Sequence, residues 1–242
     1  LGSKRFPNKV IRFIYGLPMI EHVRRRAILS NIFNKILIVS NSILIKKKLS
    51  SFKSKTILTK KKHFNGTSRV SEIAKKFNYD YGFVLFADEP FININMLKKC
   101  SKVLNKNKNV SVFNVVTNLK NGDMKSPQVV KSYINNKGYI IDYFRNSQNY
   151  YIKKNLKKST GLLIIKKKIL IKFSLLKIKL KEKKLKIEQF RFLENEIPIK
   201  SIFFKDIYPS INNKKEFNDL LKLIKKDRKE QNNLKKIKAI EY

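Results

Sequence analysis

An apolar run that ends abruptly in acid, Phe83-Val84-Leu85-Phe86-Ala87 followed by Asp88-Glu89-Pro90, constrains the fold of this 242-residue chain most strongly. Five consecutive apolar residues predict a buried strand over 83–87. In open α/β sheets, ligands bind beyond the carboxyl ends of the strands. We therefore expect Asp88 at the rim of a sheet, where it can meet a metal ion or a phosphate. The alternative role for Asp88 is that of a salt-bridged loop acid.

Strand and helix patterns alternate along the chain and predict an α/β fold with a largely parallel central sheet. Helices are expected over residues 19–30, 70–77, 95–104, 187–195 and 214–226. Strands are expected over residues 35–39, 56–59, 83–87, 110–116, 129–134, 139–144, 161–165 and 199–204. This layout predicts one domain over 1–228, with an inserted β-rich portion at about 110–165. The charged tail 229–242 is expected to fray.

The net charge of +39 suggests a polyanion as a partner. The excess is nearly all lysine, however, and it is spread over the whole chain together with many Asn, Ile, Phe and Tyr residues. These residues share A/T-rich codons, while Gly (7), Pro (6) and Trp (0) are scarce, so genome composition accounts for the bias. No zinc-finger spacing, RNP-type aromatic run or helix-turn-helix stands out. We expect nucleic-acid binding to be limited to non-specific electrostatic attraction.

The sequence contains no apolar run of the roughly 18 to 20 residues that a membrane span needs, so we expect no membrane insertion. The single cysteine, Cys100, has no internal partner for a disulfide. One unpaired cysteine suits a reducing compartment, and we expect a cytoplasmic protein.

The opening loop carries groups that suit phosphate oxygens. Gly2 and Ser3 let backbone N–H groups approach an anion, and Arg5 and Lys9 add positive charge. The spacing of a P-loop is absent. A glycine and a serine beside lysines are common in so basic a chain, so the loop alone is weak evidence.

A second glycine-containing loop, His63 to Arg69, leads into a helix and offers Asn65, Gly66, Thr67 and Arg69 to a ligand. The alternative is a helix start, with Thr67 or Ser68 as the N-cap and Glu72 in the first turn. Judged alone, the loop fits the capping role at least as well as ligand contact.

These segments, in this order, resemble the CMP-Kdo synthetases (3-deoxy-manno-octulosonate cytidylyltransferases). The family's motifs are (G/A)-S-x-R-x-P-x-K, G-K-P-M-I-x-H-V, H-x-S-G-T-D-R, Q-G-D-E-P-x-I and E-Q-L-R-x-L. The corresponding segments here are residues 2–9, 16–23, 63–69, 86–92 and 188–193. Each motif is weak alone, but five in register span nearly the whole chain.

The resemblance implies a Rossmann-like nucleotide-diphospho-sugar transferase fold and a Mg²⁺-dependent reaction. CTP and 3-deoxy-D-manno-octulosonate (Kdo) give CMP-Kdo and pyrophosphate, for lipopolysaccharide biosynthesis. It implies catalytic roles for Arg5, Lys9 and Asp88, and sugar binding by Glu188 and Gln189. The implied nucleotide-binding residues are Gly2, Ser3, Arg5, Lys9, Asn65, Gly66, Thr67 and Arg69, and the implied metal ligands are Asp88 and Asn212. It also implies a homodimer.

The chain departs from the family pattern at several of these positions. Asn212 stands where the family has a second metal-binding aspartate, and an amide has one ligand oxygen without the charge, so Mg²⁺ affinity should fall. Ser68 replaces an acid, Ser159 replaces a sugar-site histidine, and Arg145 lies one position before the family's arginine. The other departures are Phe86 and Ala87 in place of Gln and Gly. The sequence starts inside the first motif, which predicts a truncated or misplaced start.

Three alternatives remain open. The chain could be a degenerate, weakly active member of the family, or a sister nucleotidyltransferase acting on another sugar. From a different class, it could be a basic nucleic-acid-binding protein on the same fold.

Overall fold

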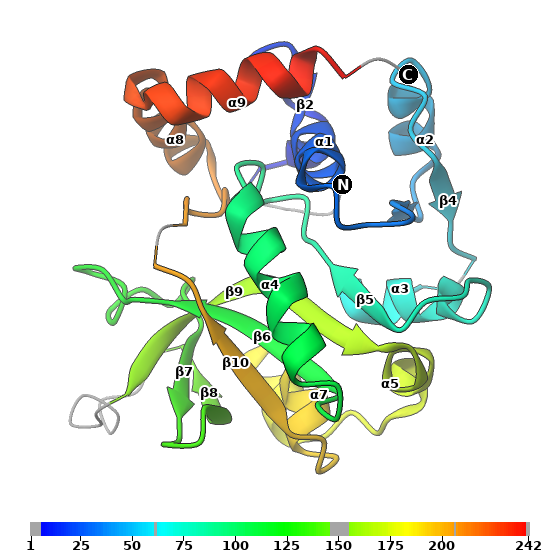
Figure 1. The fold of residues 1–242 in the computed structure, drawn as a ribbon, viewed down its shortest axis with the longest axis vertical. Coiled ribbons are helices and arrows are strands. Elements are labelled where there is room, and N and C mark those ends of the chain that lie inside the picture. Colours follow the sequence, from blue (N-terminus) through cyan, green and yellow to red (C-terminus); the bar gives the residue numbers. More distant parts are fainter. Residues whose placement is uncertain (1–5, 61, 146–154, 206, 241–242) are drawn as a thin grey trace. The chain divides into compact units, whose positions relative to one another are not determined.

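The computed structural model describes residues 6–60, 62–145, 155–205 and 207–240. The chain divides into two compact units, each built from separate stretches of sequence (Figure 1). Unit 1 takes the described residues up to 62, then Leu85–Lys102 and those from Ile207 onward. Unit 2 takes His63–Val84 and the described part of 103–206. The predicted single domain thus consists of two units, which are described separately below.

Unit 2 is built on a six-stranded sheet in the order β5-β9-β6-β10-β8-β7. Its strands are β5 (Tyr81–Val84), β6 (Val112–Thr117), β7 (Lys131–Ile134), β8 (Tyr139–Phe144), β9 (Leu156–Lys166) and β10 (Ile199–Phe203). β9 also pairs with β7, so β9, β6, β10, β8 and β7 close into a ring, with β5 at the outer edge of β9. The predicted β-rich segment is therefore part of the main sheet of this unit.

A bulge in β9 allows this ring to close. Leu163 pairs with Asn114 and Ser159 with Val116, so β9 uses four residues where β6 uses two. Beyond the bulge, β9 pairs with β7 as well. The buried Asn114 side chain donates hydrogen bonds to the carbonyls of Thr160 (3.1 Å) and Leu162 (3.0 Å). These bonds satisfy carbonyls that an irregular ladder would leave unpaired.

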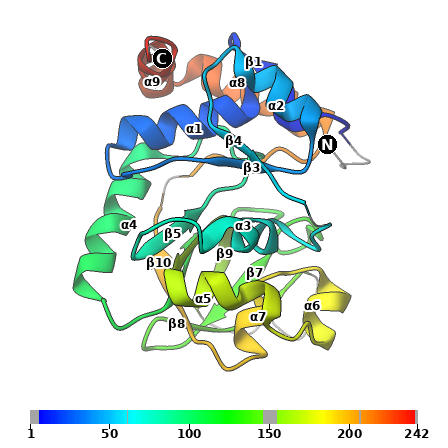
Figure 2. The same cartoon turned by 90° about the vertical axis from the view of Figure 1, so that its right-hand side faces the viewer.

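The helices of unit 2 are α3 (Gly66–Ala74), α5 (Lys167–Lys172), the 3-10 turn η3 (Phe173–Leu175), α6 (Leu180–Leu185) and α7 (Phe190–Leu193). α5 lies against β5 and β9, and α3 packs on α5 and η3 (Figure 2). All six residues of β6 are buried, as are residues 162–165 of β9, because both strands lie inside the sheet.

Unit 1 is mainly helical. A short β1–β2 hairpin (Phe13–Ile14 and Leu17–Pro18) leads into α1 (Met19–Ser30), and β3 (Ile38–Ser40) pairs in parallel with β4 (Thr56–Leu58). Its other elements are the 3-10 turn η1 (Lys9–Ile11), α2 (Ile43–Ser50), α8 (Lys214–Lys226) and α9 (Arg228–Lys238). α4 (Ile94–Lys106) begins in unit 1 and ends in unit 2.

The predicted fraying tail is instead helix α9, which packs on α1. Its charged sequence hides an inward face of Glu230, Leu234 and Ile237, spaced at i, i+4 and i+7. Glu230 forms a buried ion pair with Arg26 of α1 (2.6 Å). Leu234 and Ile237 enter the main core of unit 1. The other buried members of that core are Phe6, Ile14, Leu17, Met19, Phe91, Ile211, Leu220 and Ile224.

The predicted α/β class is confirmed, and so are the bounds of α1, β8 and α8. The expected parallel pairing occurs at β3–β4 and β6–β10, whereas the other pairs in the six-stranded sheet are antiparallel. Long β9 runs back between β5 and β6, a reversal that the strand–helix order did not reveal.

The apolar run before Asp88 forms a shorter strand than predicted. β5 covers Tyr81–Val84, and the chain then turns, with the N–H of Glu89 donating to the carbonyl of Phe86 (3.2 Å). β5 is an edge strand, and only Val84 in it is buried. Asp88 therefore lies in a turn four residues beyond the strand.

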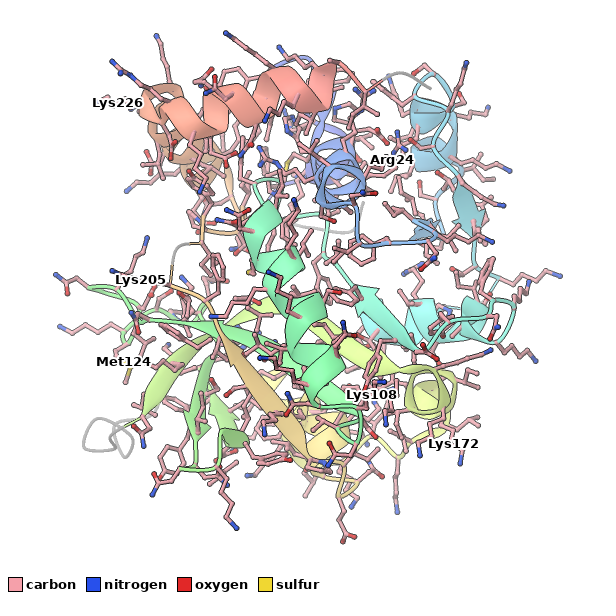
Figure 3. All side chains as sticks on the ribbon, in the orientation of Figure 1. Arg24, Lys108, Met124, Lys172, Lys205 and Lys226 are labelled. Carbon is pink, nitrogen blue, oxygen red and sulfur yellow. The ribbon has the colours of Figure 1, made fainter. Side chains whose placement is uncertain are left out.

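The positive charge is spread over the surface of both units. Basic side chains project from helices and loops throughout Figure 3, among them the labelled Lys108, Lys172, Lys205 and Lys226. No helix in the described part of the chain combines the length and the apolar character that crossing a bilayer requires.

Candidate active site

Lys9 and Asp88 meet in unit 1. The Lys9 ammonium lies 2.9 Å from Asp88 Oδ2 and also donates to the carbonyl of Ile211 at 2.9 Å. The N–H of Ile211 in turn donates to the backbone carbonyl of Asp88 (2.8 Å). Three segments that are remote in sequence are thus tied together by one lysine. The Asp88 side chain is 30% exposed, which leaves it open to solutes.

Asn212 follows directly in this chain segment. Its backbone N–H donates to Glu216 (2.6 Å), and Asn213 caps helix α8 by accepting from the N–H of Glu216 (2.9 Å). The Asn212 side chain donates to Ser210 Oγ at 3.4 Å. The predicted metal ligands Asp88 and Asn212 therefore lie in two neighbouring loop segments, which the hydrogen bond from Ile211 to Asp88 joins.

By type, the side chains of Asp88 and Asn212 could serve as ligands of a magnesium ion. The partly exposed Asp88 carboxylate and the Asn212 side-chain amide carry hard oxygen atoms, and Mg²⁺ is commonly bound by one or two carboxylates plus substrate phosphates. Within the described ranges, no cluster of three or more His, Cys, Asp or Glu residues could hold a metal ion alone. Phosphate oxygens would have to supply the remaining ligands.

The loop at 63–69 forms the start of helix α3 in unit 2. Asn65 is the N-cap: its side chain accepts from the N–H of Ser68 (2.9 Å), and Ser68 Oγ accepts from the N–H of Asn65 (3.3 Å). The helix-start role is thus confirmed, with Asn65 rather than Thr67 or Ser68 as the cap. Glu72 lies beyond the first turn and pairs with His63 (2.7 Å).

Glu188 binds the same helix end. Its carboxylate accepts from Thr67 Oγ1 (2.6 Å) and from the Thr67 N–H (3.3 Å). A carboxylate at a helix N-terminus is favoured by the helix dipole. Burial nevertheless raises the pKa of Glu188, and the nearby Glu182 raises it further, against the lowering effect of the Thr67 hydrogen bonds and Arg191. The predicted sugar residue Glu188 and the predicted nucleotide residue Thr67 are thus direct partners.

Glu182 of α6 completes this network. It accepts two hydrogen bonds from Arg191 (2.6 and 2.8 Å) and one from the Asn65 amide (3.0 Å). Both Glu182 and Arg191 are buried, and the guanidinium of Arg191 also lies 4.5 Å from the ring centre of Phe173. A buried, fully paired network of this kind holds its members in one arrangement.

The remaining predicted site residues are placed as follows. Gly66 and Arg69 lie in α3, and Gln189 is buried at the start of α7. Gly2, Ser3 and Arg5 lie outside the described residues. The predicted site residues thus fall into two groups, with Lys9, Asp88 and Asn212 in unit 1 and the others that are described in unit 2.

Ser159, which replaces the family's histidine, belongs to a buried polar cluster. Its hydroxyl and that of Tyr143 (3.1 Å) both donate to Asn114 Oδ1. Asn114 in turn bonds to the carbonyls of the β9 bulge. In this chain, Ser159 therefore helps to hold the bulge.

Several residues of these networks were not predicted. The Ile211 carbonyl that binds Lys9 is a backbone atom, so no side-chain signal identifies it. Glu182 lies in a lysine-rich stretch without a motif, and its spacing of nine residues from Arg191 spans a turn. Asn114 does carry a signal, since a lone amide within an apolar strand must find hydrogen-bond partners.

Comparisons with known proteins identify the family of this chain. The family model described as cytidylyltransferase matches residues 1–207. A 3-deoxy-manno-octulosonate cytidylyltransferase of Elusimicrobium minutum is 30% identical over 234 residues, covering 93% of this chain and 94% of the relative. One from Fusobacterium nucleatum is 31% identical over 205 residues, covering 82% and 83%.

Among solved structures, CMP:2-keto-3-deoxy-manno-octonic acid synthetase complexed with CTP superposes with a TM-score of 0.85 at 22% identity. The match covers 93% of this chain and 94% of that one. The inositol-1-phosphate CTP transferase of T. maritima gives a TM-score of 0.66 at 14% identity, covering 99% and 93%. Both share the predicted nucleotidyltransferase fold. The chain therefore belongs to the cytidylyltransferase family, with the 3-deoxy-manno-octulosonate cytidylyltransferases among its relatives.

Proposed function

We propose that this protein is a 3-deoxy-manno-octulosonate cytidylyltransferase, which converts CTP and Kdo into CMP-Kdo and pyrophosphate. The observation that carries the proposal is the similarity over 94% of the length of a curated enzyme with that name. The anomeric oxygen of Kdo forms a bond to the α-phosphorus of CTP. The bond from that phosphorus to its bridging oxygen breaks, pyrophosphate leaves, and the hydroxyl proton passes to solvent.

Unit 1 contains the groups that suit the triphosphate. Lys9 is a part-buried ammonium whose described partners are one carboxylate and one carbonyl, so it can neutralise charge on phosphate oxygens. Asp88 and Asn212 would hold Mg²⁺, which supplies charge neutralisation at the phosphates when bound. Arg5 is assigned a similar role to Lys9 on the basis of the family motif alone.

Unit 2 contains the residues assigned to the sugar acid and further residues assigned to the nucleotide. Glu188 and Gln189 are assigned to Kdo hydroxyls, and the α3 residues Asn65, Gly66, Thr67 and Arg69 to the nucleotide. The hydrogen bonds from Thr67 orient the Glu188 carboxylate before any substrate arrives, and oriented groups lower the entropic cost of the reaction. No residue needs to form a covalent intermediate, so catalysis is by positioning and electrostatics.

Magnesium dependence, a homodimeric state and action in the cytoplasm are part of the same proposal. They follow from the family resemblance. Chelation with EDTA should stop turnover and added Mg²⁺ should restore it, and sedimentation analysis should give twice the mass of one chain.

The activity test measures pyrophosphate release from CTP, Kdo and Mg²⁺, with CMP-Kdo identified by mass spectrometry. We expect product only when CTP and Kdo are both present. Absence of product from both the wild-type protein and Asn212→Asp would overturn the proposal. Turnover of CTP with another sugar acid but not with Kdo would identify a sister nucleotidyltransferase. Salt-resistant oligonucleotide binding without CTP binding would indicate the nucleic-acid-binding alternative.

A further inference from the structure

Arg145, at the end of β8, binds two separate loops of unit 2 through their backbones. Its Nη1 donates to the carbonyls of Pro127 (3.0 Å) and Gln128 (3.1 Å). Its Nε donates to the carbonyl of Leu185 (2.9 Å), and its Nη2 to that of Lys186 (3.3 Å). One guanidinium thus joins segments that are more than fifty residues apart in sequence. All three of its nitrogens take part, which suits the planar fork of arginine and no other side chain.

We call the hydrogen bonds from Arg145 to residues 127–128 and 185–186 the Arg145 clamp. Its Leu185–Lys186 end lies directly before the predicted sugar-binding residues. Lys186 ends helix α6 in the left-handed conformation, with φ of 53°, and Glu188 and Gln189 follow. A lysine in this conformation is disfavoured, so its backbone needs external support. The hydrogen bonds from Arg145 to Leu185 and Lys186 provide that support at the turn itself.

Lys131 holds the other side of Arg145. Its fully buried ammonium donates to the carbonyl of Ser126 (2.6 Å) and to the backbone carbonyl of Arg145. Lys131 pairs with Phe144 across β7 and β8, so it lies opposite the residue that precedes Arg145. Burial lowers the pKa of Lys131 to about 8, and the positive charges of Arg145 and Lys158 lower it further, while Asp123 opposes the shift.

A buried ammonium with carbonyl partners is a costly way to stabilise a fold, because an apolar side chain of the same volume often serves as well or better. What the ammonium and the guanidinium add is a fixed geometry. Together they connect the 126–128 loop, the end of β8 and the α6–α7 turn.

We propose that Arg145, supported by Lys131, is a positioning residue that holds the α6–α7 turn so that Glu188 and Gln189 face the sugar acid. This inference rests on the proposed function. Arg145 acts through backbone contacts and does not itself bind substrate.

The test compares Arg145→Gln, Arg145→Lys and the control Lys167→Gln. Lys167 lies at the start of α5, bonds to Asn78 and lies 5.6 Å from the ring centre of Tyr79, so its loss removes one charge without touching the clamp. We expect Arg145→Gln to raise the KM for Kdo about tenfold while the KM for CTP stays within about twofold. Arg145→Lys, which can reach only one of the two loops, should restore part of the loss. The control should match the wild-type protein.

Amide hydrogen exchange over residues 183–193 provides a readout independent of turnover. The N–H groups of Lys186, Phe190 and Arg191 are hydrogen-bonded to backbone carbonyls three or four residues earlier, and we expect them to exchange faster in Arg145→Gln than in the control. Lys131→Met keeps the volume of the stem and removes the ammonium. It should speed the same amides to a smaller extent without unfolding the protein.

Unchanged exchange over 183–193 in Arg145→Gln would show that Arg145 does not hold the α6–α7 turn. Faster exchange with an unchanged KM for Kdo would overturn the positioning role, since the contacts would then be merely structural. If the wild-type protein turns over no Kdo, the proposed function fails, and the exchange measurement still decides whether Arg145 holds the turn.

Discussion

The two groups of site residues are held in different ways. In unit 1, Asp88 is partly exposed and its described side-chain partner is the Lys9 ammonium, in an ion pair that a ligand can replace. In unit 2, Glu188 is bound by Thr67, and the neighbouring pair of Glu182 and Arg191 is buried. The first arrangement can reorganise around a charged ligand, whereas the second is set before a ligand arrives. Mutations of the unit 1 residues should therefore lower activity with little loss of stability, whereas mutations of the unit 2 residues should lower both.

The largest expected effect is that of Asp88→Ala. We expect kcat/KM to fall by at least about a hundredfold, because the variant loses the carboxylate proposed to hold the metal. The free energy of unfolding should fall by about 1 kcal/mol or less, since a partly exposed ion pair contributes little. Steady-state kinetics and urea denaturation provide the two measurements.

The matched control for Asp88→Ala is Glu89→Gln, which removes the adjacent acid. It should retain activity close to that of the wild-type protein. If Asp88→Ala keeps its activity, or unfolds, the contrast between the two units is wrong.

Glu188→Ala should show the opposite balance. Removing the carboxylate leaves the N–H and hydroxyl of the buried Thr67 without their acceptor, which should cost about 1–3 kcal/mol of stability. The KM for Kdo should rise about tenfold. Thermal unfolding and kinetics with varied Kdo measure the two effects, and a variant with unchanged thermal stability would contradict a preformed network.

Asn212→Asp should strengthen Mg²⁺ binding by the unit 1 residues a few-fold. The substitution adds a second carboxylate beside Asp88, so the Mg²⁺ concentration that gives half-maximal activity should fall. Titration of activity with Mg²⁺ measures this, and Asn213→Asp at the cap of α8 is the control. An unchanged Mg²⁺ requirement would mean that position 212 does not contact the metal.

The smallest effects concern pH, and they have opposite signs in the two units. In unit 1, burial lowers the pKa of His22 from 6.5 to about 4, with further lowering by Arg26 and Arg25 against the hydrogen bond to Ile14. The unfolded chain therefore binds more protons, so the His22 contribution is present above pH 6.5 and is lost as the pH falls toward 4. In unit 2, the raised pKa of Glu188 means that the folded chain binds more protons, so its contribution is lost as the pH rises.

Urea denaturation between pH 4 and pH 7 can separate these contributions. Relative to His22→Gln, the wild-type protein should lose stability as the pH falls. Relative to Glu188→Gln, it should gain stability over the same change. If both differences in free energy of unfolding change with pH in the same direction, the environments assigned to His22 and Glu188 are wrong.

The sequence predicted elements with strong local patterns. Helix α1 and helix α8 have regular apolar spacing, and β8 is preceded by a turn over 135–138, so their bounds were correct. It could not predict that β9 runs back between β5 and β6, because antiparallel pairing of distant strands leaves no local pattern. Helix α9 was missed because its apolar residues are few, and only the contact with α1 shows that Glu230 is buried.

The motifs named side chains that the structure brings together, while their roles in the reaction stay predictions. The pairing of Lys9 with Asp88 agrees with their joint assignment from family motifs, and Asn65 to Arg69 do form one loop and helix end. The partners of those side chains were not predictable, because the Ile211 carbonyl and the carbonyls bound by Arg145 are backbone atoms. Their placement depends on tertiary structure, which short motifs do not encode.

The make-up of unit 1 has a consequence for synthesis on the ribosome. Its core joins Phe6, Ile14 and Met19 to Leu234 and Ile237, so it cannot be completed until more than two hundred further residues have been translated. The strands of unit 2 all lie between residues 81 and 203 and emerge earlier. Unit 2 can therefore fold on the nascent chain while the apolar side chains of α1 still await α9. During that interval, α1 is the segment that a chaperone would have to shield.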